Sequence, residues 1–359
     1  MKKTILTCTI LCLIFSNKLL TCTNFQVKAK DGSVVIGRTM EFPVDIKSNI
    51  WLVPRGEQYT SISDKKVKGL SWKTKHAFLA LDGFDLSSNY IDGMNEKGLS
   101  VGGLMFVGAK YQEAIPGNFV NNTDFASWIL GNFATVDEVK KELEKINVVD
   151  MPLKKLHGSM GLHFDITDTS GNSIVVEFIA GEKKIYENKV GVLTNRPDFN
   201  WQTTNLSNYI NLQHEDKEPR TINAHKIIPT GVGSGMLGLP GDWTPPSRFV
   251  KVAYALDAST PAKNSIEAVN LAEHIMNMVD IPKGVIKEKV NPVIHVYGYA
   301  QWSIIKDLKN KIMYFRTYDN VGLKKIEMSK LNMAEGAKKK SFAIEKQFAN
   351  AIDVTEQVQ

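Results

Sequence analysis

Cysteine is scarce in this 359-residue chain, and its three cysteines, Cys8, Cys12 and Cys22, all lie within the first 22 residues. The rest of the sequence therefore offers no disulfide framework and no paired cysteines of the kind that bind zinc. The seven histidines are scattered, and no H-E-x-x-H stretch is present. The pattern predicts no metal site, and it leaves the position of Cys22 to be explained.

Other common motifs are also missing. The sequence has no G-x-S-x-G nucleophile turn and no G-x-x-x-x-G-K-[ST] phosphate loop. The glycine-rich stretch at residues 231–243, GVGSGMLGLPGDW, does not match G-x-G-x-x-G because Met236 stands where the third glycine belongs. A tightly turning loop is the better interpretation of this stretch. We therefore expect no cofactor.

Long apolar runs and an excess of one charge sign are absent as well. Beyond the N-terminal segment, no apolar run reaches the roughly 20 residues needed to span a bilayer. The net charge of +6 combines 44 basic with 38 acidic residues, too small an excess to indicate a nucleic-acid partner. No linker, repeat or low-complexity tract divides the chain, so residues 22–359 are predicted to form a single domain.

The N-terminal segment has the layout of a secretory signal peptide. Lys2 and Lys3 precede an apolar run that ends near Phe15, too short to cross a bilayer as a helix. A buried N-terminal helix is the alternative. We expect residues 1–21 to be a signal peptide. The residues just before Cys22 are poorly suited to cleavage, so a short propeptide that is trimmed afterwards is also considered. Their removal would leave a net charge of +3 and one cysteine in a periplasmic or secreted protein.

Cleavage before Cys22 would give one residue both a nucleophile and a base. A free α-amine has a pKa near 7.7–8.0 and a cysteine thiol one near 8.5, so the amine can take the thiol proton close to neutral pH. Such a residue can attack an amide carbonyl and form a thioester. The alternative is that Cys22 is lipidated, which would make the chain an exported lipoprotein with a binding or surface role.

The order of predicted elements favours an α+β fold. Residues 32–42, 173–181 and 312–319 are rich in β-branched and aromatic residues and are bounded by turn-forming residues. Residues 135–146 carry a capping box, with Thr135 as the N-cap of an amphipathic helix. A second helix is expected to begin near Ser247 as its N-cap, and a third over residues 264–280.

Four segments together carry a resemblance to a known family: CTNF with KDGSVVIGRTMEF (22–42), YIDGMNEKGLSVGGLMF (90–106), VGVLTNRPDFNWQTTNLSNY (190–209) and GLPGDWTPPSRFVKVAY (238–254). In this order the chain resembles the choloylglycine hydrolase and penicillin V acylase family of N-terminal-nucleophile hydrolases. The resemblance runs to about residue 319. It implies a four-layer αββα sandwich with two antiparallel sheets between helical layers, and one catalytic amidohydrolase domain that cuts linear amide bonds.

The resemblance also implies roles for individual residues. Cys22 matches the N-terminal nucleophile, Arg38 and Arg248 match the two arginines beside it, and Asn195 matches the asparagine of the oxyanion hole. Glu41 stands where the family usually has aspartate, so its carboxylate is expected to bind the Cys22 amine from a longer stem. Taken singly, each polar residue is equally typical of a surface or turn position.

Met105 is the second departure from the family. Bile salt hydrolases carry asparagine at this position and penicillin V acylases often tyrosine, but the backbone N–H can still serve the oxyanion hole. The acyl pocket is predicted to include the side chains of Met40, Phe42, Met105 and Phe106, although ordinary core packing explains them nearly as well. The resemblance leaves open which small-molecule N-acyl amide is cut (bile salts, penicillin V or acyl homoserine lactones), and it implies a homotetramer.

Overall fold

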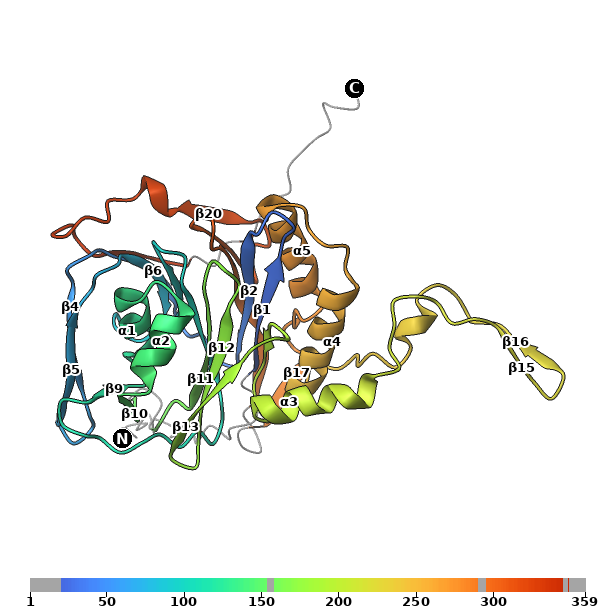
Figure 1. Ribbon diagram of the computed structural model, residues 1–359, viewed down its shortest axis with the longest axis horizontal. Helices are drawn as coiled ribbons and strands as arrows, with labels where there is room; N and C mark the ends of the chain where they lie inside the picture. The colour runs from blue at the N-terminus through green and yellow to red at the C-terminus, as the bar shows by residue number, and fades with distance from the viewer. Residues whose placement is uncertain (1–20, 154–157, 290–294, 345–347, 349–359) are drawn as a thin grey trace, which may run out of the picture.

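The structure is a computed structural model that describes residues 21–153, 158–289, 295–344 and 348. The predicted signal peptide, apart from Thr21, lies outside this part of the chain. Two antiparallel sheets lie face to face, and helices cover their outer faces (Figure 1). This arrangement confirms the predicted α+β class and its αββα layering.

The first sheet has seven strands and holds Cys22 in its second strand. In spatial order it contains β14 (Val192–Leu193), β1 (Thr21–Lys28), β2 (Val34–Phe42), β18 (His295–Asp307), β19 (Ile312–Thr317) and β20 (Lys324–Glu327), with β17 (Ile286–Lys289) paired to β18. Gly32 closes the β1–β2 hairpin with a φ of 79°, a left-handed conformation that glycine adopts without strain. The turn-forming residues expected before the strand in residues 32–42 therefore form a hairpin turn.

The second sheet has eight strands. Its order is β13 (Glu182–Glu187), β12 (Ser173–Ile179), β11 (Leu162–Thr167), β8 (Ser100–Met105), β7 (Tyr90–Asn95), β6 (Phe78–Asp82), β3 (Asn49–Val53) and β21 (Lys340–Ala343). Three further two-stranded pairs lie outside the main sheets: β4 (Gln58–Ile62) with β5 (Lys68–Lys73), β9 (Phe119–Asn121) with β10 (Asn147–Val149), and β15 (Arg220–Ile222) with β16 (His225–Ile227).

The helices lie on the outer sides of the two sheets. They are α1 (Phe125–Asn132), α2 (Val136–Leu143), α3 (Phe199–Asn205), α4 (Pro245–Ala258) and α5 (Ser265–Asn277), with short 3-10 turns at Leu206–Tyr209, Ser234–Met236 and Met328–Lys330. Helix α1 packs on β7 and β8, whereas α4 and α5 pack on β1 and β2 (Figure 1). Thr135 caps α2 as predicted, because its side chain accepts the Glu138 N–H.

The predicted start of α4 was wrong. The helix begins at Pro245, with Thr244 as its N-cap, and not after Ser247. Proline fits the first turn of a helix because the N–H groups there have no partner within the helix. The Ser247 hydroxyl instead donates to the Asp242 carboxylate at 2.6 Å.

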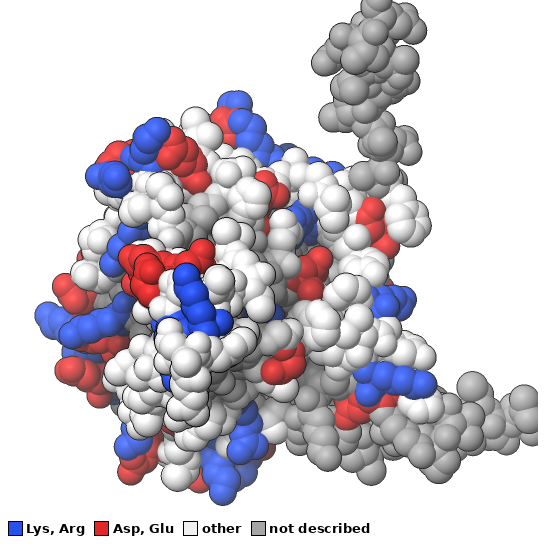
Figure 2. All heavy atoms as spheres, turned by 90° about the vertical axis from the view of Figure 1, so that its right-hand side faces the viewer, with Lys and Arg blue, Asp and Glu red and all other residues white. Residues whose placement is uncertain are grey.

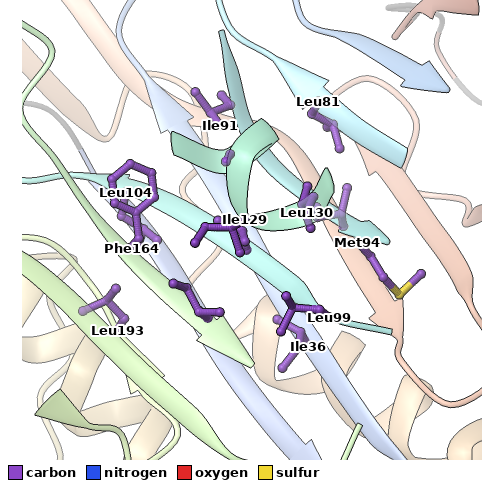
Figure 3. Close-up of a cluster of buried hydrophobic side chains, with 14 of the residues drawn as sticks. Ile36, Leu81, Ile91, Met94, Leu99, Leu104, Ile129, Leu130, Phe164 and Leu193 are labelled. Atoms are coloured by element: carbon purple, nitrogen blue, oxygen red, sulfur yellow. The ribbon is translucent and has the colours of Figure 1, made fainter. Parts of the chain in front are cut away.

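The core fills the space between the sheets and beneath α1. Figure 3 shows Ile36 of β2 near Leu99 and shows Ile129 and Leu130 of α1 over the strands that carry Leu81 and Met94. All of these side chains are at most 2% exposed. Because side chains alternate along a strand, the even-numbered residues of β2 face this core and the odd-numbered ones face α4 and α5.

Candidate active site

Cys22 sits where the edge of the first sheet is left incomplete. Strand β14 pairs with β1 only at Asn24 and Phe25, and it ends at Leu193. The backbone of Cys22 therefore finds side-chain partners in place of a neighbouring strand. Its N–H donates to Asn195 Oδ1 at 2.6 Å, and its carbonyl accepts from Arg248 Nη1 at 2.6 Å. Three of the predicted residues thus meet at this gap.

Arg38 approaches the thiol from the neighbouring strand. It shares the inner face of β2 with Met40, which pairs directly with Cys22. The Arg38 Nη2 atom lies 3.9 Å from Cys22 Sγ and donates to the Gly103 carbonyl at 2.8 Å. Its Nη1 atom donates to the Asp92 carboxylate at 2.8 Å. The guanidinium is fully buried and fixed on several sides.

Arg248 comes from the first turn of α4 and reaches the other side of Cys22. Its Nη2 donates to Asn195 Oδ1 at 2.9 Å, its Nε donates to the Trp243 carbonyl at 3.0 Å, and its Nη1 also donates to the Thr23 hydroxyl. Arg248 is fully buried. One guanidinium therefore joins the nucleophile strand to the asparagine segment.

Asn195 and the backbone of Met105 lie beside the sulfur. The Asn195 amide donates to the Met105 carbonyl at 2.8 Å, and the Met105 N–H is directed at the Cys22 thiol. A side-chain amide and a backbone N–H beside a nucleophile are typical donors of an oxyanion hole. The structure brings together the two donors that the sequence predicts.

Burial and the neighbouring positive charges shift the pKa of the Cys22 thiol in opposite directions. Burial raises the pKa of Cys22, and Glu41 also raises it, whereas the positive charges of Arg38 and Arg248 and the Met105 N–H lower it. The Arg38 contribution is the largest of those that oppose burial. The two arginines thus favour the thiolate form that attacks carbonyl carbon.

Glu41 lies on the opposite face of β2 from the thiol. It pairs with Thr21, one residue before Cys22, and its side chain points toward α4. Burial raises the pKa of Glu41 to about 7, although Arg248 acts against this shift. Thr39 lies close by, yet neither carboxylate oxygen accepts a hydrogen bond of ordinary geometry. Asp45, the next carboxylate along the chain, is exposed and accepts the Lys47 N–H.

A narrow apolar pocket of about 20 Å³ adjoins the sulfur. Met40, Phe42 and Met105, three of the four residues proposed from the sequence for an acyl pocket, line it together with Cys22, Ile46, Gly83, Phe84, Ile91, Gly103, Met160 and Leu162. Phe106 is not among these lining residues. Its ring stacks on His163 with centroids 4.8 Å apart, because it follows the last residue of β8 and turns toward β11. Residue type alone could not distinguish these two environments.

Several buried charges around the site were missed from the sequence. Asp92 and Lys306 lie behind Arg38, and the pair formed by His163 and Glu177 lies behind Asn195. Each is a charged or polar residue inside an apolar strand run, which is the signal that marks a buried ionic group. Among the described residues, no cluster of three or more histidine, cysteine or acidic side chains is arranged to hold a metal ion.

The fold and the site together define the class of this protein. An αββα sandwich with a cysteine near the start of an inner strand is the arrangement of an N-terminal-nucleophile hydrolase, and the arginines and asparagine beside this cysteine agree with the resemblance seen in the sequence. The family model for linear amide C–N hydrolases, choloylglycine hydrolase family, matches residues 22–355. The chain belongs to this family and is a hydrolase of linear amide bonds.

Relatives of known activity cover nearly the whole chain. A bile salt hydrolase/transferase of Clostridium perfringens is 35% identical, over 87% of this chain and 94% of the relative. A crystal structure of a conjugated bile acid hydrolase variant from the same organism superposes with a TM-score of 0.82 at 33% identity, covering 92% of this chain and all of that one. A penicillin V acylase structure from Agrobacterium tumefaciens gives a TM-score of 0.73 at 25% identity, covering 89% and 90%.

Proposed function

We propose that the mature chain begins at Cys22 and hydrolyses N-acyl amides whose acyl group is apolar. The observation that supports this most directly is the hydrogen bond from the Cys22 nitrogen to Asn195 Oδ1, with Arg38 and the Met105 N–H beside the sulfur. Nitrogen, sulfur and oxyanion donors lie within one small volume. Cleavage after Thr21 would turn that nitrogen into an amine without moving it.

The reaction follows from these positions. The amine takes the thiol proton, and the thiolate attacks the amide carbon. The tetrahedral oxyanion is held by the Asn195 amide and the Met105 N–H. The α-ammonium then protonates the leaving amine as the C–N bond breaks and a thioester forms. Water, deprotonated by the α-amine, releases the acid and restores the thiol.

Glu41 has a role only after cleavage. In the chain described here the Cys22 nitrogen is an uncharged peptide amide, because Thr21 still precedes it. The Glu41 carboxylate is completely buried and accepts no hydrogen bond of ordinary geometry from the described residues. Cleavage would place an α-ammonium on Cys22, next in the chain to the Thr21 that pairs with Glu41, and would add a positive charge to that of Arg248. We assign to Glu41 the role of binding that ammonium from the neighbouring strand β2, where Glu41 pairs with Thr21.

The pocket supports an apolar and flexible acyl group. Its small size means that an acyl chain enters only when lining side chains move. Three methionines, Met40, Met105 and Met160, contribute to the lining, and methionine repacks more readily than branched residues. Bile salts and penicillin V, which the names of the relatives specify, and acyl homoserine lactones all place an apolar group next to the amide.

Export and assembly are further parts of the proposal. The charged-then-apolar start of the chain supports a signal peptide and a periplasmic or secreted enzyme. The structure has no helix, among the described residues, that is long and apolar enough to cross a membrane. The arm formed by β15 and β16 projects from the body (Figure 1) and exposes Ile222, Ile227 and Ile228. Such an arm suits contact with a second copy in a homotetramer.

The decisive experiment combines the mass of the N-terminal peptide with an amide panel. An unmodified Cys22 with a free amine, and release of amine from at least one panel member, is the expected result. Cys22→Ser should reduce the release to background, because the hydroxyl is a far weaker nucleophile. A lipid adduct on Cys22 would support the alternative, an exported lipoprotein, and overturn the enzyme assignment.

A further inference from the structure

Three fully buried charged side chains connect the two sheets behind the thiol. Asp92 of β7 accepts from Arg38 Nη1 at 2.8 Å through Oδ2 and from Lys306 Nζ at 2.6 Å through Oδ1. Arg38 and Lys306 belong to β2 and β18 of the other sheet. The side chains of all three residues are 0% exposed. One carboxylate is therefore shared between two cations, only one of which touches the sulfur.

Among the described residues, no other side chain donates a hydrogen bond to the Asp92 carboxylate. Gly102 lies beside it, and a Cβ atom built there would stand 3.2 Å from Asp92 Oδ2. Lys306 has one further contact, a 3.5 Å hydrogen bond to the Val101 carbonyl. Asp165 also acts on Lys306 through its charge, but its own oxygens accept from Thr167, Ser173 and Asn188.

The charge count explains why two cations are useful. Arg38 paired with Asp92 alone would be neutral and would offer little to a thiolate. With Lys306 on the second carboxylate oxygen, the triad carries a net charge of +1, and its Arg38 end lies 3.9 Å from the sulfur. On the other side of Cys22, Glu41 is charged above its pKa of about 7 and then offsets the charge of Arg248. The surplus positive charge therefore comes from the triad.

We propose that Lys306 is a positioning residue that holds Asp92 and offsets its charge, so that Arg38 stays fixed and favours the Cys22 thiolate. The inference rests on the proposed function only in taking Cys22 as the reacting thiol. Lys306 acts through Asp92 and Arg38 and does not itself touch the substrate.

The pKa directions agree with this arrangement. Burial raises the pKa of the Cys22 thiol, Arg38 is the strongest group opposing it, and Glu41 and Arg248 are the other charges that face it. Burial lowers the pKa of Lys306, and Asp92 acts against that shift together with Asp165, whereas Arg38 adds to it.

The test is a titration of the Cys22 thiolate by its absorbance near 240 nm, with the Cys22→Ser chain subtracted to remove the contribution of Cys8 and Cys12. The measurement needs no turnover and no access to the pocket. An inactive wild type would therefore count against the proposed function and still leave this inference testable. Lys306→Gln keeps a donor to Asp92 and loses the charge. At pH values below the thiol pKa, we expect the thiolate fraction of this variant to fall about tenfold, which corresponds to a rise of about one unit in the pKa of Cys22.

A charge-restoring double variant separates electrostatics from packing. Asp92→Asn combined with Lys306→Met removes one charge of each sign, so Arg38 again leaves a surplus of +1. We expect the double variant to recover most of the lost thiolate. Lys306→Arg should stay within about twofold of wild type, as should Lys309→Met at an exposed site nearby. A thiolate fraction unchanged in Lys306→Gln, or a double variant no better than that single variant, overturns the proposal. If Lys306→Gln does not fold, the double variant alone tests the proposal. The charge count predicts a thiolate fraction near that of wild type for the double variant, so a fraction well below wild type would contradict it.

Discussion

The imidazole of His163 and the carboxylate of Glu177 face one another at 2.9 Å, completely buried behind Asn195. The other imidazole nitrogen of His163 faces the Thr194 carbonyl at 2.7 Å. Glu177 in turn accepts the Phe199 N–H at 3.0 Å through Oε1. Both ring nitrogens of His163 therefore lie within hydrogen-bond distance of an oxygen atom. The two side chains hold both ends of the segment that carries Asn195.

Removing one partner of this pair should destabilise the protein strongly. Glu177→Ala leaves His163 without its partner and the Phe199 N–H without an acceptor. Each buried polar group left without its partner costs about 1–3 kcal/mol of unfolding free energy, and urea denaturation would measure the loss. Glu182→Ala, at an exposed position in the next strand, is the control. A loss below about 1 kcal/mol in Glu177→Ala would show that the pair does not hold this segment.

Asn195 offers a test of the oxyanion hole itself. Asn195→Ala removes the amide donor and should lower kcat by about 10²–10³-fold with a smaller effect on KM. Asn195→Asp keeps the oxygen that accepts from Cys22 and Arg248, and it should stay more stable to heat while losing comparable activity. Steady-state kinetics and thermal melting of the two variants measure both effects. If Asn195→Asp kept wild-type kcat, the amide would not be the donor.

The raised pKa of Glu41 predicts an unusual pH dependence of stability for the chain that still carries residues before Cys22. The folded-state pKa is about 7, above the ordinary value of 4.5, so the folded state binds this proton more tightly than the unfolded state does. The protonated form of Glu41 therefore stabilises the folded state fully below pH 4.5. As the pH rises from 4.5 to about 7 this contribution is lost, and the free energy of unfolding falls by about 3 kcal/mol. Glu41→Gln should remove this decline, whereas the exposed Glu113→Gln should not.

The comparison of unprocessed and processed chains completes that test. A chain that starts at Cys22 carries an α-ammonium beside the carboxylate, which should lower the pKa of Glu41 and flatten the decline. Urea denaturation of both chains at pH 5 and pH 8 would measure the difference. Equal slopes in the two chains would show that Glu41 does not pair with the amine.

Local sequence predicted the elements better than it predicted their contacts. The strands β2, β12 and β19 were predictable because β-branched runs ended at turn residues, and α2 was predictable from its capping box. The start of α4 was not, because two prolines before Ser247 are compatible with either a turn or a first helical turn.

The site itself depends on contacts that no local pattern encodes. Cys22 and Asn195 are 173 residues apart and meet because β14 ends early at the sheet edge. The resemblance to a family supplied that pairing in advance. The contact between Asp92 and Lys306 requires the register of two stacked sheets, which composition and periodicity do not fix. By contrast, strand alternation alone predicts that the side chains of Arg38 and Glu41 lie on opposite faces of β2.

Met105 separates the role of a backbone donor from that of a side chain. It is the last residue of β8, its N–H is directed at the Cys22 sulfur, and its side chain lines the pocket. Met105→Ala keeps the N–H, so kcat should stay within a few-fold of wild type while the preference among acyl groups shifts toward bulkier ones. Met105→Pro removes the N–H, and kcat should fall by about 100-fold or more for every substrate.

The amide panel, run with both variants and with Met105→Leu as the size-matched control, would measure these effects. Melting temperatures would show whether proline at this strand end disturbs the fold. Activity retained by a folded Met105→Pro variant would exclude the backbone donor. An unaltered preference in Met105→Ala would instead show that the acyl group does not reach this side chain, and that other lining residues such as Met40 and Met160 set the specificity.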